Sequence, residues 1–149
     1  MSSYNNDQVL RYDGESGDFL DVFVTEASGG LYGPSNTVFR DNVFVVVSAR
    51  SSAVLRYDAG SGDFLGALVT PGSAGLNYPH YAQFHDGILY LAGKRNDNIL
   101  MYDADSGAFL GQLVAPRSAG LNGPRGLLIL PVTQTCCRRV ACLPPKADL

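Results

Sequence analysis

A repeat of 45 residues constrains this chain more than any other feature of its sequence. The segment Val9–Asp13, VLRYD, returns unchanged at Val54–Asp58 and as ILMYD at Ile99–Asp103. The same spacing relates Phe19, Phe64 and Phe109; Leu31, Leu76 and Leu121; and Pro34, Pro79 and Pro124. Because no insertion or deletion interrupts the register, the sequence predicts three copies of one structural unit.

Each unit is predicted to hold four short β-strands. In the second unit, VLRYD is followed by a turn at residues 59–63 and by a strand at 64–69. A Gly-rich loop then leads to a strand at 81–84, an Asp-Gly turn, and a strand at 88–92. Gly or Pro interrupts nearly every window long enough for a helix, which excludes helical repeats of similar period. Four strands in about 40–50 residues are typical of a β-propeller blade.

The repeated pattern resembles the NHL repeat. The motifs that carry the likeness are VLRYD, SGDFLG at 61–66, GLNGPRGL at 120–127 and DGILYLA at 86–92. The pattern is similar, more narrowly, to the near-identical tandem NHL-like blades of bacterial surface and secreted proteins, and the likeness covers about residues 8–130. The resemblance implies an all-β fold of propeller blades. It implies little about activity, because propellers carry many unrelated functions.

We expect one domain, residues 1–130, followed by a divergent and irregular tail at 131–149. Placed in blade order, the segments are two outer strands (Val9–Asp13 and Phe19–Val24), two complete blades (about 35–69 and 80–114) and one inner strand (Arg125–Leu130). That makes about three blades, whereas closed propellers use about four to eight. Two interpretations stay open at this point. Either a homodimer closes a six-bladed ring, or the chain is a segment of a longer propeller or a truncated product.

The tail contains every cysteine of the chain: Cys136, Cys137 and Cys142. Their spacing does not match a zinc site, and an odd number of cysteines suggests ordinary thiols. The Asp-Gly turn and strand expected after Leu130 are missing from the sequence. One hypothesis is that the tail is a frameshifted remnant of a further inner hairpin, because codons compatible with residues 132–137, read one base earlier, allow Gly-Asp-x-Asn-Leu-Leu.

Six polar residues are the candidates for ligand binding. Ser35, His80 and Arg125 occupy equivalent positions at the entrance to the predicted inner strands, so a closed ring would array them around its pore as an anion-binding rim. Three further cations, Arg50, Lys94 and Arg95, lie in equivalent turns and add positive charge. We predict no catalytic residue and no metal ligand, since the two histidines, His80 and His85, point to opposite faces of a strand.

Composition excludes several classes of function. With 11 Lys and Arg against 14 Asp and Glu, the net charge is −3, which is not a nucleic-acid-binding composition. No apolar run is long enough to cross a bilayer, and the first residues have neither the basic nor the apolar region of a signal peptide. Resembling proteins are often exported, so the compartment stays open.

The sequence therefore favours a non-enzymatic scaffold without a cofactor, which binds a protein, peptide or glycan and associates with itself. The alternative is a hydrolase or lyase of the NHL-like propeller type, whose active site faces the pore. A third interpretation is an inactive propeller fragment.

Overall fold

The computed structural model describes residues 1–130 and shows an all-β architecture. The predictions made for residues 131–149, including those for the three cysteines, lie outside the described residues. Eleven strands form three antiparallel sheets in the described part of the chain, and its only helices are single 3-10 turns. No helix within residues 1–130 is long and apolar enough to cross a membrane.

Within each sheet the strands follow one another in chain order. Sheet 1 contains β1 (Ser2–Ser3), β2 (Gln8–Tyr12) and β3 (Phe19–Val24). Sheet 2 contains β4 (Pro34–Arg40), β5 (Val43–Ser48), β6 (Ala53–Asp58) and β7 (Phe64–Val69). Sheet 3 contains β8 (Pro79–His85), β9 (Ile88–Gly93), β10 (Asn98–Asp103) and β11 (Phe109–Val114). The 3-10 turns η1 (Ser28–Gly30), η2 (Ser73–Gly75) and η3 (Ser118–Gly120) follow the last strand of each sheet.

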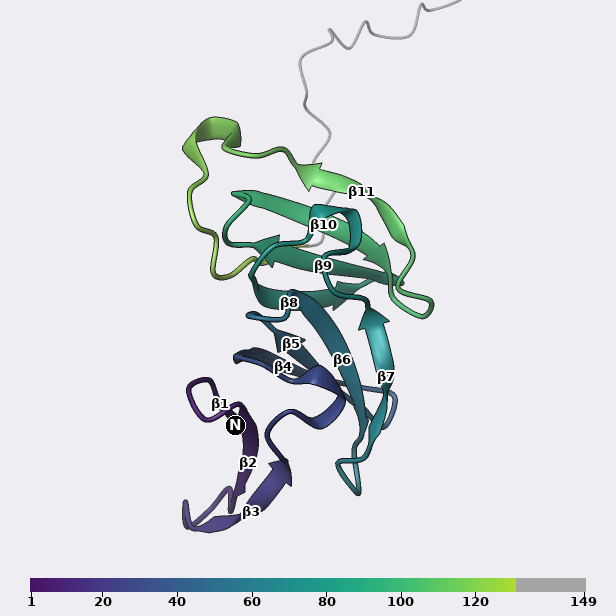
Figure 1. The fold of residues 1–149 in the computed structure, drawn as a ribbon. Coiled ribbons are helices and arrows are strands. Elements are labelled where there is room, and N and C mark those ends of the chain that lie inside the picture. The colour runs from purple at the N-terminus through teal and green to yellow at the C-terminus, as the bar shows by residue number, and fades with distance from the viewer. Residues whose placement is uncertain (131–149) are drawn as a thin grey trace, which may run out of the picture.

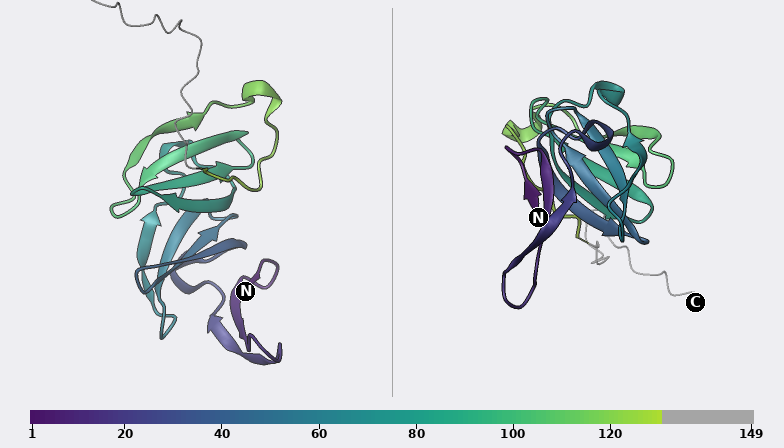
Figure 2. Two further views of the ribbon diagram at one scale, coloured as in Figure 1. Left: turned by 180° about the vertical axis from the view of Figure 1, so that it is seen from behind. Right: turned by 60° about the horizontal axis from the view of Figure 1, so that its bottom comes forward.

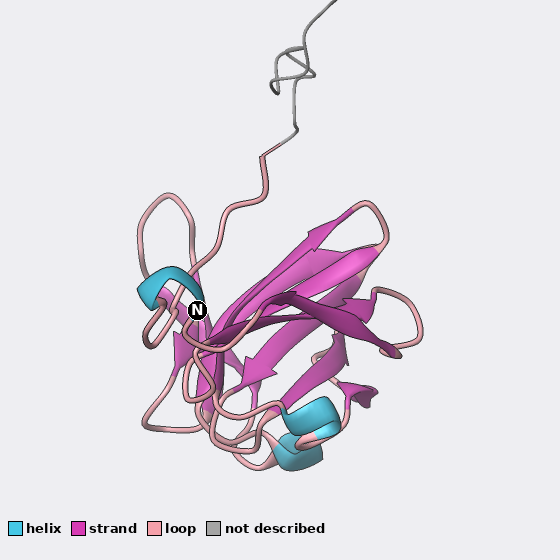
Figure 3. Ribbon diagram, turned by 90° about the horizontal axis from the view of Figure 1, so that it is seen from above, coloured by secondary structure: helices cyan, strands magenta, loops and turns pink. Residues whose placement is uncertain are grey.

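The three sheets are stacked face to face. In Figure 1 the stack runs from sheet 1, near the N-terminus, through sheet 2 to sheet 3, and the view from behind in Figure 2 shows the same order. Seen along the stack in Figure 3, the strands of one sheet lie over those of the next. Strands β4 and β8 contact each other across the gap between sheets 2 and 3. The two four-stranded units predicted at about 35–69 and 80–114 are confirmed.

Short polar turns define the strand ends. The Asp58 carboxylate accepts hydrogen bonds from the backbone N–H groups of Gly60 (2.9 Å) and Ser61 (2.8 Å), which closes the β6–β7 turn. In the β8–β9 turn, Asp86 and Gly87 both have positive φ, 47° and 74°, the geometry that a two-residue hairpin requires.

Apolar side chains fill both spaces between the sheets. Alternation along β5 sends Val46 toward sheet 1, where it joins Val9 and Leu55. The same alternation sends Val45 toward sheet 3, where it joins a cluster that includes Leu100. Sheet 2 is therefore covered on both faces, whereas sheets 1 and 3 each have one face that no other sheet of the described chain covers.

Two details differ from the sequence prediction. The chain adds a short strand, β1, whose residue Ser3 pairs with Gln8 as Ser48 pairs with Ala53 one repeat later. Residues 125–130, predicted as an inner strand, have no regular secondary structure. The inner strands β4 and β8 each pair with the strand that follows them, whereas no strand among residues 1–130 pairs with residues 125–130.

Candidate binding rim

Equivalent turns in successive sheets bring cations to one edge of the stack. Arg50 lies between β5 and β6, and Lys94 and Arg95 lie between β9 and β10. Each turn places a residue in the left-handed region before its next strand, Ser52 (φ 55°) and Asp97 (φ 52°). Short polar side chains tolerate that conformation, so the repeat presents its turn side chains in the same way each time.

Tyrosine rings support these cations. The Arg50 guanidinium lies 4.5 Å from the Tyr4 ring centroid and 5.1 Å from that of Tyr32. Lys94 Nζ and the Arg95 guanidinium lie 5.1 and 4.4 Å from the Tyr78 ring centroid. Cation–π attraction holds each of these charges over a tyrosine ring.

The two groups of cations are joined through a pair of phenols. The hydroxyls of Tyr4 and Tyr78 form a hydrogen bond, although the two residues are 74 positions apart. The hydrogen bond from Tyr4, together with the positive charge of Lys94, lowers the pKa of Tyr78. The turns of sheets 1, 2 and 3 thus meet at one continuous surface, which we call the cationic rim: Tyr4, Tyr32, Arg50, Tyr78, His80, Lys94, Arg95 and Arg125.

His80 and Arg125 belong to this surface, whereas Ser35 points into the fold. Burial lowers the pKa of His80, and the charges of Lys94 and Arg125 lower it further. Ser35 Oγ instead donates to the carbonyl oxygens of Pro79 (3.3 Å) and Val47 (3.4 Å). Ser35 therefore links two sheets. The other five predicted residues are the cationic side chains and the histidine of the rim: Arg50, His80, Lys94, Arg95 and Arg125.

Few carboxylates neutralise the rim. Asp7 lies 3.7 Å from Arg50. Among the ion pairs of residues 1–130, none includes Lys94, Arg95 or Arg125. No group of three or more His, Cys, Asp or Glu side chains that could hold a metal occurs in that same part of the chain.

The sequence prediction missed the three tyrosines. Each stands where the other repeats carry a different kind of residue: Tyr4 is equivalent to Ala49 and Lys94, and Tyr78 to Gly33 and Gly123. Tyr32 is likewise equivalent to Asn77 and Asn122. A search for departures from the repeat, rather than for agreement with it, would have found them.

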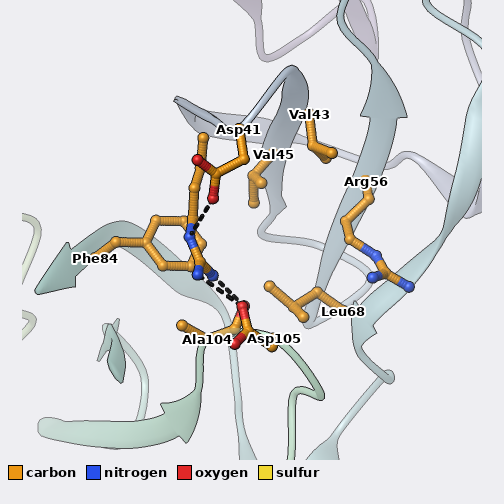
Figure 4. A pocket seen from close by; sticks show the side chains of 9 residues that line it. Asp41, Val43, Val45, Arg56, Leu68, Phe84, Ala104 and Asp105 are labelled. Atoms are coloured by element: carbon orange, nitrogen blue, oxygen red, sulfur yellow. Dashed lines mark hydrogen bonds and ion pairs between the residues drawn. The ribbon is translucent and has the colours of Figure 1, made fainter. Parts of the chain in front are cut away.

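A small hollow of about 180 Å³ lies between sheets 2 and 3, where the β4–β5 and β10–β11 turns approach each other (Figure 4). Arg40 dominates it: the guanidinium donates to the carbonyl oxygen of Ala104 (2.6 Å) and to the carboxylate of Asp105 (2.6 Å). It also pairs with Asp41 at 3.3 Å and lies over the Phe84 ring, 5.1 Å from the centroid. These contacts satisfy the guanidinium internally, so this hollow is a link between sheets.

Comparison with known proteins supports the fold alone. No protein-family model and no curated protein matches the chain. Among solved structures, the chain is similar to the computationally designed Ika8 protein (TM-score 0.50, 18% identity), with 74% of this chain and 33% of that one covered. The designed Ika4 protein has a TM-score of 0.50 at 18% identity, with 72% and 61% covered. AztD from Citrobacter koseri has a TM-score of 0.51 at 16% identity, with 76% and 31% covered. This chain thus spans between about a third and three fifths of these structures.

Proposed function

We propose that the chain is a non-enzymatic binding scaffold of NHL-like propeller blades, whose cationic rim binds an acidic peptide. The stacked sheets and the 45-residue register support the blade assignment, and the solved structures support the all-β fold on which it rests. A scaffold of this kind presents equivalent turns side by side, and a binding surface forms where those turns carry matching side chains.

The observation that carries the proposal is the position of Lys94 and Arg95 over Tyr78, outside every ion pair of the described residues. The chain as a whole is acidic, with a net charge of −3. The cations gathered on one edge attract an anion to that edge. The negative net charge of the chain disfavours binding of the anion elsewhere. Arginine forms paired hydrogen bonds with carboxylates, which favours Glu and Asp side chains as the groups recognised.

Titration calorimetry with a hexaglutamate peptide tests this function, with hexaglutamine as the uncharged control peptide. We expect hexaglutamate alone to bind, and its affinity to fall as salt is added. The double variant Lys94→Ala, Arg95→Ala should bind about tenfold more weakly, since each exposed charge pair contributes up to about 1 kcal/mol.

Arg11→Ala is the matched control for that variant, because Arg11 pairs with Asp21 on sheet 1, away from the rim. It should bind hexaglutamate as the unaltered chain does. Equal affinity for the two peptides, or an unchanged affinity in the double variant, would contradict the proposal. Cleavage of the bound peptide would favour the hydrolase alternative instead.

A further inference from the structure

The contacts between successive sheets repeat every 45 residues. At each end of the stack lie residues equivalent to one side of these contacts, without a neighbouring described sheet to supply the other side. One such contact is a tyrosine hydrogen bond. Tyr57 Oη donates to the carbonyl oxygen of Ser28, and Tyr102 Oη donates to that of Ser73, both at 2.8 Å. Both tyrosines are fully buried, whereas the equivalent Tyr12 on sheet 1 is 42% exposed.

A second contact involves a turn glycine. A Cβ built on Gly62 would lie 2.1 Å from the carbonyl oxygen of Phe23, and one on Gly107 would lie 1.6 Å from that of Leu68. In both places, the turn of one sheet presses directly against the outer strand of the preceding sheet. The equivalent turn glycine of sheet 1, Gly17, has nothing within 4 Å.

The opposite end of the stack exposes the complementary half. Phe23 and Leu68 on the outer strands of sheets 1 and 2 are 9% and 5% exposed, but their equivalent Leu113 on sheet 3 is 52% exposed. Leu31 and Leu76, which follow η1 and η2, are each 2% exposed. The corresponding leucine after η3, Leu121, is only partly buried. The outer-strand part of an apolar surface that is buried twice within the chain is therefore open at its third occurrence. The inner part of the same face, Tyr90, Ala92 and Ile99, is buried, and Leu127 and Ile129 pack against it.

We propose that the open face of sheet 1 docks on the open face of sheet 3 of a second copy of this chain. The repeat fixes the register: Tyr12 Oη would donate to the carbonyl oxygen of Ser118, and Gly17 would lie against that of Leu113. The occupant is a second copy because each face is the repeat equivalent of the surface that already covers its counterpart within the chain.

The same register explains the missing inner strand. Residues 125–130 are equivalent to residues 35–40 and 80–85, which form most of β4 and β8, and sheet 1 has no strand of that kind. In the docked pair, residues 125–130 would stand beside the short β1 of the second copy, so each shared sheet takes strands from both chains.

The number of copies follows from the size of closed rings. This inference rests on the propeller assignment made under the proposed function. Two copies of the three described sheets give six blades, a number within the range of about four to eight that closed rings use. In such a pair each open sheet face is covered, so the head-to-tail contact closes instead of growing into a filament.

Light scattering on the full-length chain tests the assembly directly. We expect twice the 15.9 kDa mass of one chain at micromolar concentration. Leu113→Asp should reduce the mass to that of one chain, because it places a charge in an apolar contact. Leu110→Asp is the matched control: Leu110 lies on the same strand and is also 52% exposed, but its equivalents Leu20 and Leu65 are exposed too. This control should keep the two-chain mass.

Mixing two variants tests the head-to-tail arrangement. Tyr12→Asp and Leu113→Asp should each have the one-chain mass alone, because every contact in the pair uses one Tyr12 and one Leu113. Mixed together they should regain the two-chain mass, because one of the two contacts is then intact. Circular dichroism establishes that each variant is folded.

If light scattering gives the unaltered, folded chain the mass of a single chain, the inference is overturned, whatever the masses of the variants. It is also overturned if Leu110→Asp and Leu113→Asp change the mass equally, or if mixing restores nothing. The hexaglutamate titration is a separate readout, because Lys94, Arg95 and Tyr78 all belong to one chain. Failure of the assembly and failure of peptide binding are thereby distinguished.

Discussion

The hydroxyl of Tyr102 donates a 2.8 Å hydrogen bond to the carbonyl oxygen of Ser73, and this bond ties sheet 3 to the loop that leads out of sheet 2. The two residues are 29 positions apart, and Tyr57 and Ser28 repeat the contact one unit earlier at the same separation. In sheets 2 and 3, a side chain on the third strand thus holds the connection from the preceding sheet.

Removing this hydroxyl should weaken the fold measurably. We expect Tyr102→Phe to lower the free energy of unfolding by about 1 kcal/mol, since the ring stays packed and only the hydrogen bond is lost. Urea unfolding followed by circular dichroism measures the change. Tyr32→Phe is the control, because the Tyr32 hydroxyl has no hydrogen-bond partner among the described residues, and it should change stability by less than about 0.5 kcal/mol.

Gly107 should tolerate a side chain less well than Gly17. Both have positive φ, 70° and 79°, so alanine is strained at either position by about 1 kcal/mol. Only at Gly107 would the new Cβ meet the Leu68 carbonyl oxygen, at 1.6 Å. We expect Gly107→Ala to cost about 1–3 kcal/mol more than Gly17→Ala because of this overpacking. The comparison is made by urea unfolding in the Leu113→Asp background, which keeps a second copy away from Gly17.

His80 should make the fold less stable in mild acid. Burial, with the charges of Lys94 and Arg125, lowers the pKa of His80 below its ordinary value of 6.5. The unfolded chain then binds a proton on this side chain at a higher pH than the folded chain does. The contribution of His80 to the free energy of unfolding is therefore fully present above pH 6.5, and it is lost as the pH falls below that value.

His80→Gln should flatten this part of the pH profile, as measured by urea unfolding at a series of pH values. The profile below about pH 4, where carboxylates titrate, should keep its shape. An unaltered slope between neutral pH and pH 5 in the variant would show that another group is responsible.

The aspartates that close the strand turns should act in stronger acid. Hydrogen bonds from Ser61 and Gly60 lower the pKa of Asp58, and bonds from Ser106 lower the pKa of Asp103, relative to 3.8. Since the folded chain keeps these carboxylates ionised more readily, their contribution is present above pH 3.8 and is lost as the pH falls below it.

Asp103→Asn should therefore remove part of the acid sensitivity of unfolding while keeping a turn-forming side chain. Glu26→Gln, an exposed carboxylate outside these turns, serves as the control. Equal acid profiles for the two variants would show that the turn carboxylate has no special part in acid unfolding.

The sequence predicted the strands well where the repeat and the turns agree. The Asp-Gly turn at Asp86 between two apolar runs located β8 and β9 to within a few residues, because a hairpin depends on interactions close in the chain. It did not predict β1, since Ser2 and Ser3 have little strand preference and pair only because Gln8 and Val9 lie beside them.

The candidate site was predicted only in part. Repeat position located Arg50, Lys94 and Arg95 on one edge. It could not foresee that Tyr4 and Tyr78, 74 residues apart, would meet and join those cations into one surface. Ser35 was expected at the rim by the same logic, but its hydroxyl turns to backbone oxygens of β5 and β8.

The sequence by itself determined the unit: four strands with polar turns, copied every 45 residues, because hairpins depend on apolar runs and turn chemistry within a short stretch of chain. Only the tertiary structure decided which copy of each side chain is buried. Tyr12, Tyr57 and Tyr102 occupy the same position in the repeat. Their burial differs because another sheet lies against the rings of Tyr57 and Tyr102, whereas no other sheet among residues 1–130 covers the ring of Tyr12.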